Sequence, residues 1–202
     1  MFENPDISAL EDAAERLGLS PEAGYLDKVI AIVEPLSAGY ADLGLLPDLL
    51  PAVAYPRDGG RRPTADENPF GAWYVKTDIA GAPDGPLAGR RVAIKDSIYV
   101  AGVPMMHGSC LFEGFVPDMD ATVVTRILDA GGVIAGKAVC ENYCVSGGSH
   151  TSSTGPVVNP RCPGHSAGGS SSGSAALVAA GDVDMAIGGD QAGSIRIPSA
   201  YC

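Results

Sequence analysis

The hydrophobic and polar positions in residues 91–139 follow first a strand-like and then a helix-like period. Residues 91–95 form a short apolar run with β-branched side chains, and residues 133–139 form a second such run. Between them, residues 121–130 space their apolar side chains as a helix does, and Gly131 follows. A strand, a helix and a strand in this order predict a right-handed crossover. The expected fold class is α/β, with a mostly parallel sheet flanked by helices.

Residues 168–202 continue this order with a loop, a helix, a strand and a second loop. The small side chains of 174–180 predict a helix that ends at Gly181, and the alternation of 183–187 predicts a short strand. Both flanking loops are rich in Gly and Ser. Because ligands bind at the carboxyl ends of parallel strands, the two loops are expected to meet and form a site.

The N-terminal residues 1–50 predict a small helical region. Residues 6–17 have a helical pattern, with Ser8 and Glu11 as a capping box and Gly18 as the C-terminal stop. We therefore expect the first helix to begin close to Ser8.

A second helix is predicted to begin with Ser20 as N-cap and Pro21 as its first residue. Its apolar face stops before Pro35, because proline disfavours a helix interior. A weaker helical stretch covers residues 36–50. Residues 51–69 contain four prolines and Gly59-Gly60, so we expect a linker there and the α/β part after it.

Composition and charge exclude several classes of function. With 202 residues and 46% hydrophobic content, the chain can bury one sizeable core. The formal net charge of −11 argues against a nucleic-acid partner, which requires clustered Lys and Arg. Neither a signal peptide nor a long apolar run is found in the sequence, so we expect a cytoplasmic protein that has no membrane partner.

Five cysteines, an odd number, are spread over a chain without a signal peptide, so reduced thiols are expected. Cys140 and Cys144 are four positions apart and do not form a Cys-x-x-Cys motif, and the three histidines occur singly. We therefore predict no metal site.

Two familiar motifs can be set aside. Val92-Ala93-Ile94-Lys95 matches the lysine strand of protein kinases, but the glycine-rich loop and the downstream kinase motifs are missing from the sequence. Residues 169–173 satisfy Gly-x-Ser-x-Gly, but no apolar strand precedes them and no histidine follows Ser171. A serine hydrolase with a histidine base is therefore disfavoured.

A serine can instead be activated by a neutral, buried lysine, and Lys95 is the candidate. Its apolar neighbours are consistent with burial, whereas Asp96 could favour the charged amine. Lys95 and the Gly/Ser-rich loops also have non-catalytic interpretations. Lys95 could be a solvated surface residue, and the loops could be flexible connections or anion-binding turns.

Three segments taken together resemble the amidase signature family: Val-Ala-Ile-Lys-Asp at 92–96, Gly-Gly-Ser-Ser-Ser-Gly-Ser at 168–174, and Gly-Gly-Asp-Gln-Ala-Gly-Ser-Ile-Arg-Ile-Pro-Ser at 188–199. The helical N-terminus is similar to that of the enantioselective bacterial amidases associated with nitrile hydratases. The resemblance implies a mixed, mostly parallel sheet over residues 70–202. It also implies that this α/β domain is truncated on its C-terminal side, because family members are normally far longer.

The resemblance implies a Ser–cis-Ser–Lys triad. Carried over to this sequence, Ser194 is the nucleophile, Ser170 the bridging proton carrier and Lys95 the general base. The Gly169–Ser170 peptide is expected to be cis. That bend would let one hydroxyl face both the lysine amine and the nucleophile.

The resemblance also implies an oxyanion hole built from backbone N–H groups of Gln191, Ala192 and Gly193. Ala192 departs from the glycine that is more usual there, and it would be strained if the position required a positive φ. Asp190 and Arg196 bracket Ser194, and we expect them to pin the loop through hydrogen bonds.

The implied reaction is the hydrolysis of a carboxylic amide to the acid and ammonia, without a cofactor. The implied partner is a small-molecule amide, and a homodimer is expected for the full-length protein. Two alternatives remain. One is a protein like the ammonia-supplying subunit of the tRNA-dependent amidotransferases, and the other is a catalytically incompetent fragment that ends at Cys202.

Overall fold

The computed structural model describes residues 4–43, 46 and 50–202. The chain divides into two compact units, Met1–Leu50 and Pro51–Cys202, and each is described by itself.

The described residues of the first unit form two helices, of which α1 spans Ile7–Arg16. Its N-cap is Asp6, whose carboxylate accepts a hydrogen bond of 2.8 Å from the backbone N–H of Ala9. The capping box predicted from Ser8 is therefore wrong, because Ser8 already lies inside the helix. Gly18, at φ 68°, follows the end of the helix as predicted.

The second helix, α2, spans Tyr25–Leu43 and begins later than Ser20 and Pro21 predict. Pro35 lies inside α2, so the stretch predicted over 36–50 continues the same helix as far as Leu43. Residues 44–45 and 47–49 of that prediction lie outside the described residues. Proline interrupts the hydrogen bonding of a helix locally and does not always end it.

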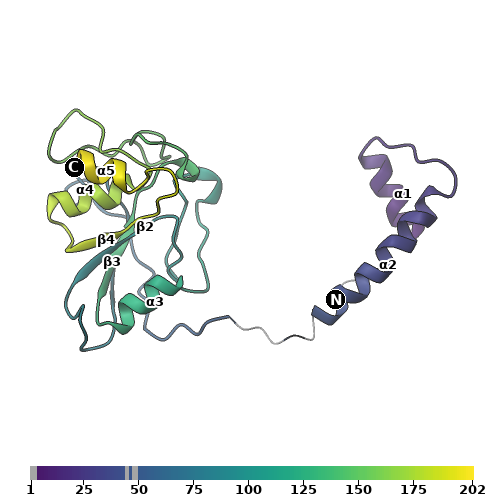
Figure 1. Cartoon of the computed structure of the whole chain (residues 1–202), viewed down its shortest axis with the longest axis horizontal. Coiled ribbons are helices and arrows are strands. Elements are labelled where there is room, and N and C mark those ends of the chain that lie inside the picture. Colours follow the sequence, from purple (N-terminus) through teal and green to yellow (C-terminus); the bar gives the residue numbers. More distant parts are fainter. Residues whose placement is uncertain (1–3, 44–45, 47–49) are drawn as a thin grey trace. The chain divides into compact units, whose positions relative to one another are not determined.

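The second unit is built on a four-stranded sheet in the order β1-β3-β2-β4 (Figure 1). Strand β2 pairs in parallel with both β3 and β4, whereas β1 pairs antiparallel with β3. The predicted class, a mixed and mostly parallel sheet flanked by helices, is confirmed. The strands are β1 (Trp73–Ala80), β2 (Arg91–Lys95), β3 (Val133–Ala138) and β4 (Met185–Ile187).

Three α-helices accompany the sheet: α3 (Thr122–Asp129), α4 (Ser172–Ala180) and α5 (Arg196–Tyr201). Helix α3 packs against β3, while α4 packs against β2, β3, β4 and α5. A single apolar cluster lies between these elements and is made mainly of Val, Ile, Leu and Ala side chains. Among the described residues, no helix combines the length and the apolar character needed to cross a bilayer.

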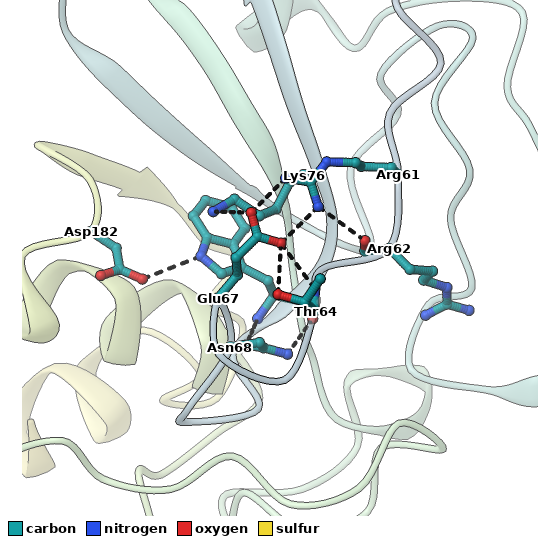
Figure 2. Close-up of polar contacts among 8 residues, drawn as sticks. Arg61, Arg62, Thr64, Glu67, Asn68, Lys76 and Asp182 are labelled. Atoms are coloured by element: carbon teal, nitrogen blue, oxygen red, sulfur yellow. Dashed lines mark hydrogen bonds and ion pairs between the residues drawn. The ribbon is translucent and has the colours of Figure 1, made fainter.

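The proline-rich segment before β1 makes specific contacts with that strand (Figure 2). Arg61 exchanges two backbone hydrogen bonds with Lys76, and its guanidinium binds the carboxylate of Glu67 at 2.5 and 2.7 Å. The side chain of Asn68 donates to and accepts from the backbone of Trp73. This part of the segment expected to be a linker therefore holds the start of β1 in place.

Candidate active site

Lys95 is the last residue of β2, an inner strand of the sheet, and only 1% of it is exposed. Its amine lies 2.8 Å from the hydroxyl of Ser170 and 3.4 Å from the carbonyl oxygen of Gly189. The solvated surface lysine considered from the sequence is thus excluded. The geometry suits proton exchange between the amine and one serine hydroxyl.

Ser170 is completely buried, and the Gly169–Ser170 peptide bond is cis. The carbonyl of Ser170 accepts a hydrogen bond of 3.2 Å from the backbone N–H of Glu141. A Cβ atom on Gly169 would lie 2.0 Å from the carbonyl oxygen of Gly148, so only glycine fits at that position. Backbone contacts on both sides therefore fix the Ser170 hydroxyl against Lys95.

Ser194 lies on the second loop and is half-buried. Its carbonyl accepts a hydrogen bond of 3.0 Å from the backbone N–H of Ser171, so the two Gly/Ser loops lie side by side as predicted. The hydroxyl of Ser171 links the loops a second time through the backbone of Gly189, at 3.3 Å. Within the described part of the chain, the Ser194 hydroxyl itself makes no hydrogen bond.

Asp190 holds the Ser194 loop in shape. Its carboxylate accepts hydrogen bonds from the backbone N–H groups of Gly193, Ile195 and Arg196 at 2.7–3.1 Å, and two more from the Arg196 guanidinium at 2.9–3.0 Å. The Arg196 side chain, followed by these backbone donors, lowers the pKa of Asp190. The carboxylate therefore stays ionised, and the pinning role expected for both residues is confirmed.

The three residues predicted for the oxyanion hole differ in their surroundings. The N–H of Gly193 is engaged by Asp190 at 2.7 Å, whereas Gln191 and Ala192 are exposed. The positive φ in this loop falls at Gly193, at 123°, and not at Ala192, so alanine causes no backbone strain there. The backbone N–H groups of Gln191 and Ala192 donate no hydrogen bond within the described residues.

A second buried lysine lies next to the first, and sequence reasoning missed it. Lys137 is on β3, where it pairs with Ile94 of β2, and it is 0% exposed. Its amine donates to the carbonyl oxygen of Ile98 at 2.7 Å and lies 3.5 Å from Oδ1 of Asp96. The signal that could have revealed it was a lone lysine inside the otherwise apolar strand 133–139.

Two thiols also lie near Lys95. A hydrogen bond between Cys140 and Cys144 lowers the pKa of Cys144 to about 5, with smaller contributions from Lys95, Ser97 and His107. The same hydrogen bond and burial raise the pKa of Cys140. In the described ranges, no group of three or more His, Cys, Asp and Glu side chains is arranged to hold a metal ion.

A cavity of about 330 Å³ opens beside this site. It lies between α4, α5 and the edge strand β4, and Ser171, Ile195 and Cys202 contribute to its wall. Lys95, Ser170 and Ser194 do not line it, so the cavity adjoins the candidate site without containing it.

The sequence profile of the family described as Amidase matches residues 70–202. The chain belongs to the amidase family. A curated relative, the enantioselective amidase of Rhodococcus rhodochrous, is 63% identical over 142 residues, which cover 69% of this chain and 28% of the relative. A glutamyl-tRNA(Gln) amidotransferase subunit of Haloarcula marismortui is 48% identical over 133 residues, 66% of this chain and 31% of that protein.

Solved structures of the amidase family share the fold. The crystal structure of a glutamyl-tRNA(Gln) amidotransferase subunit from Thermotoga maritima matches with a TM-score of 0.59 at 37% identity, over 61% of this chain and 27% of that one. A peptide amidase in complex with the inhibitor chymostatin matches with a TM-score of 0.54 at 40% identity, over 57% and 25% of the respective chains. The chain thus spans about a third or less of the length of these relatives.

Proposed function

We propose that this chain supplies the catalytic groups of an amidase that hydrolyses a carboxylic amide to the acid and ammonia. In this proposal Ser194 is the nucleophile, Ser170 carries the proton and Lys95 is the general base. The observation that carries it is the distance of 2.8 Å between the buried Lys95 amine and the Ser170 hydroxyl, on a loop hydrogen-bonded to the backbone of Ser194.

Acylation begins with a neutral Lys95 amine. The amine takes the hydroxyl proton of Ser170 while Ser170 takes that of Ser194, and the Ser194 Oγ bonds to the amide carbon. The carbonyl oxygen becomes an oxyanion, for which the N–H groups of Gln191 and Ala192 are the proposed donors. One such donor contributes about 3 kcal/mol to the stability of the transition state.

The tetrahedral intermediate collapses when the carbon–nitrogen bond breaks. The proton held by Lys95 passes through Ser170 to the leaving nitrogen, and ammonia departs from an ester of Ser194. Water then attacks the ester carbon and gives a proton through Ser170 to Lys95. The bond between this carbon and Ser194 Oγ then breaks, the proton returns through Ser170 to Ser194 Oγ, and the acid leaves without any cofactor.

The test is ammonia release by the complete protein on one aliphatic and one aromatic amide. Ser194→Ala is expected to abolish release, and Lys95→Ala is expected to reduce it by orders of magnitude. Ser199→Ala changes an exposed serine five positions further along and serves as the matched control. Unchanged release by either active-site variant would refute the role assigned to that residue.

A second candidate function is that of an amidotransferase subunit. It is favoured by the 48% identity to the Haloarcula marismortui protein, which is named for glutamyl-tRNA(Gln). The two candidate functions differ in whether ammonia release requires a partner protein and ATP. Ammonia release from a simple amide by the isolated protein, without ATP or a partner protein, supports the amidase. A strict requirement for a partner supports the amidotransferase, and no release under either condition supports an incompetent fragment.

We also propose a cytoplasmic location, a small-molecule amide as partner in place of nucleic acid, and a homodimer for the complete protein. The net charge of −11 supports the exclusion of nucleic acid. Cell fractionation tests the location, and light scattering of the purified protein tests the dimer.

A further inference from the structure

Residues 141–151, which follow β3, contact the peptide unit between Gly169 and Ser170 on both sides. At the start of this segment, the backbone N–H of Glu141 donates a hydrogen bond of 3.2 Å to the carbonyl of Ser170. Further along, the carbonyl of Gly147 accepts a hydrogen bond of 2.9 Å from the backbone N–H of Gly169. Ser170 is therefore held in place by a segment that belongs to neither of the two Gly/Ser loops.

The side chain of Glu141 closes this segment into a loop, which we call the 141–151 loop. Glu141 is 0% exposed. Its Oε2 atom accepts hydrogen bonds from the backbone N–H of His150 at 3.1 Å, the backbone N–H of Thr151 at 2.9 Å and the Thr151 hydroxyl at 2.7 Å. The same hydroxyl accepts a hydrogen bond of 3.1 Å from the backbone N–H of Asn142. The two ends of the loop are thus joined in the protein interior, where hydrogen bonds are stronger than in water.

The Glu141 side chain also packs directly against Gly169. A Cβ atom on Gly169 would lie 2.8 Å from Cγ of Glu141 and 2.0 Å from the carbonyl oxygen of Gly148, so both parts of the loop are in close contact with this glycine. The second carboxylate oxygen of Glu141, Oε1, makes no hydrogen bond within the described residues. Closure of the loop by this side chain therefore depends on Oε2.

We propose, on the basis of the function proposed above, that Glu141 is a positioning residue for the proton relay: its carboxylate closes the 141–151 loop, and the closed loop holds Ser170 against the Lys95 amine. Proton transfer requires that the two groups lie within hydrogen-bond reach, and a misplacement of about 1 Å can lower a rate about 100-fold. Glu141 acts through backbone hydrogen bonds and transfers no proton itself.

Two substitutions of similar size separate the acceptor from the bulk of the side chain. Glu141→Met keeps the length but removes the oxygen acceptor, whereas Glu141→Gln keeps one oxygen for the three donors. In the complete protein, Glu141→Met is expected to lower kcat for ammonia release by about 100-fold with KM unchanged, because the relay acts after the amide has bound. Glu141→Gln is expected to retain most of kcat. Equal losses of kcat in the two variants, or a rise in KM in place of a fall in kcat, would overturn the proposal.

A milder pair of variants decides the question if Glu141→Met fails to fold. Thr151→Val removes one of the three donors to Oε2, so kcat is expected to fall by less than in Glu141→Met, and Thr151→Ser restores the hydroxyl and the activity. Ser152→Ala removes a buried hydroxyl one position further along, whose contact at 2.9 Å is the hydroxyl of Thr154, and it is the matched control with unchanged kcat. Equal kcat values for Thr151→Val and Thr151→Ser would count against the proposal.

The position of Ser170 can also be measured without substrate, in crystal structures of the complete Glu141→Gln and Glu141→Met proteins. The distance from the Lys95 amine to the Ser170 hydroxyl is expected to stay near 2.8 Å in the first and to exceed about 3.5 Å, the limit of a hydrogen bond, in the second. This measurement separates the inference from the proposed function. If Lys95→Ala retains full turnover, the function fails, while a lengthened distance in Glu141→Met still establishes the positioning role. An unchanged distance refutes that role even if Lys95 proves essential.

Discussion

The backbone N–H of Ser171 donates a hydrogen bond of 3.0 Å to the carbonyl of Ser194. These two residues are far apart in the sequence, on loops that precede α4 and follow β4. Because the bond joins main-chain groups, it fixes the spacing of the loops independently of the side chains that carry out the proposed chemistry. Substitutions of single hydroxyls should therefore test their chemical roles without moving the loops.

Ser170→Ala removes the hydroxyl that lies 2.8 Å from the Lys95 amine. We expect kcat to fall by about 10²- to 10⁴-fold, the usual contribution of a positioned proton carrier, with a much smaller change in KM. Ser172→Ala removes an equally buried hydroxyl whose contact is a carbonyl oxygen at 3.5 Å, and it is the matched control. Steady-state kinetics of the complete protein measure both. Equal losses in the two variants would contradict a specific role for Ser170.

Asp190→Asn weakens the acceptor that organises the Ser194 loop, and it is expected to lower both kcat and thermal stability at neutral pH. The pKa of Asp190 is lowered by Arg196 and by backbone donors. A lowered pKa in the folded state means that this stabilisation is present above the unfolded pKa of about 4 and is lost as the pH falls below it. Thermal unfolding between about pH 2 and pH 7 measures the difference between variant and unchanged protein. A difference that grows on acidification would contradict the assignment.

Cys144 is expected to react with iodoacetamide as a thiolate under mildly acidic conditions. With a pKa of about 5, its alkylation rate should level off above about pH 6. The rate for glutathione in the same solution should still rise toward about pH 8, because an ordinary thiol has a pKa of about 8.5. Mass spectrometry of the labelled peptide measures the rate.

The control variant for this thiol is Cys140→Ala. It removes the hydrogen bond that contributes most to the lowered pKa of Cys144, so the midpoint of the rate profile should move to higher pH. An unchanged midpoint would mean that the surrounding charges, and not the Cys140 thiol, determine the reactivity.

Gly169→Ala tests the close approach of the two loops around Ser170. The added Cβ would lie 2.0 Å from the carbonyl oxygen of Gly148 and 2.8 Å from Cγ of Glu141. Overpacking of this kind typically costs about 1–3 kcal/mol of folding free energy, and activity should fall with it. Denaturant unfolding measures the cost. Gly39→Ala, where nothing lies within 4 Å of the new Cβ, is expected to cause no loss.

Sequence reasoning located the elements whose signals are local. Strand β2 was predicted with its observed bounds, and α3 and β3 were predicted to within one residue at each end, because apolar period and flanking glycines define them. Strand β1 was missed because it directly follows a proline-rich segment and pairs antiparallel with β3, a partner that no local pattern reveals. The start of α2 was missed because Ser20 and Pro21 are good starting residues that the chain does not use.

The proposed triad residues were named from motif resemblance, whereas the surroundings of Lys95 depend on strand pairing. Lys137 lies opposite Ile94 only because β2 and β3 are parallel with a particular register. The same pairing places Cys140, which follows β3, near Lys95. A tight turn after Cys140 then brings Cys144 close to both residues. Residues far apart in the sequence meet there, and such contacts cannot be read from a single chain's periodicity.

The carboxylate of Asp190 anchors its loop through the backbone N–H groups of residues 193, 195 and 196. The side chains at positions 191 and 192 take no part in these contacts. Gln191 and Ala192 are exposed, only two or three positions before the proposed nucleophile. Substitutions at these two positions are therefore expected to leave intact the hydrogen bonds through which Asp190 holds the loop.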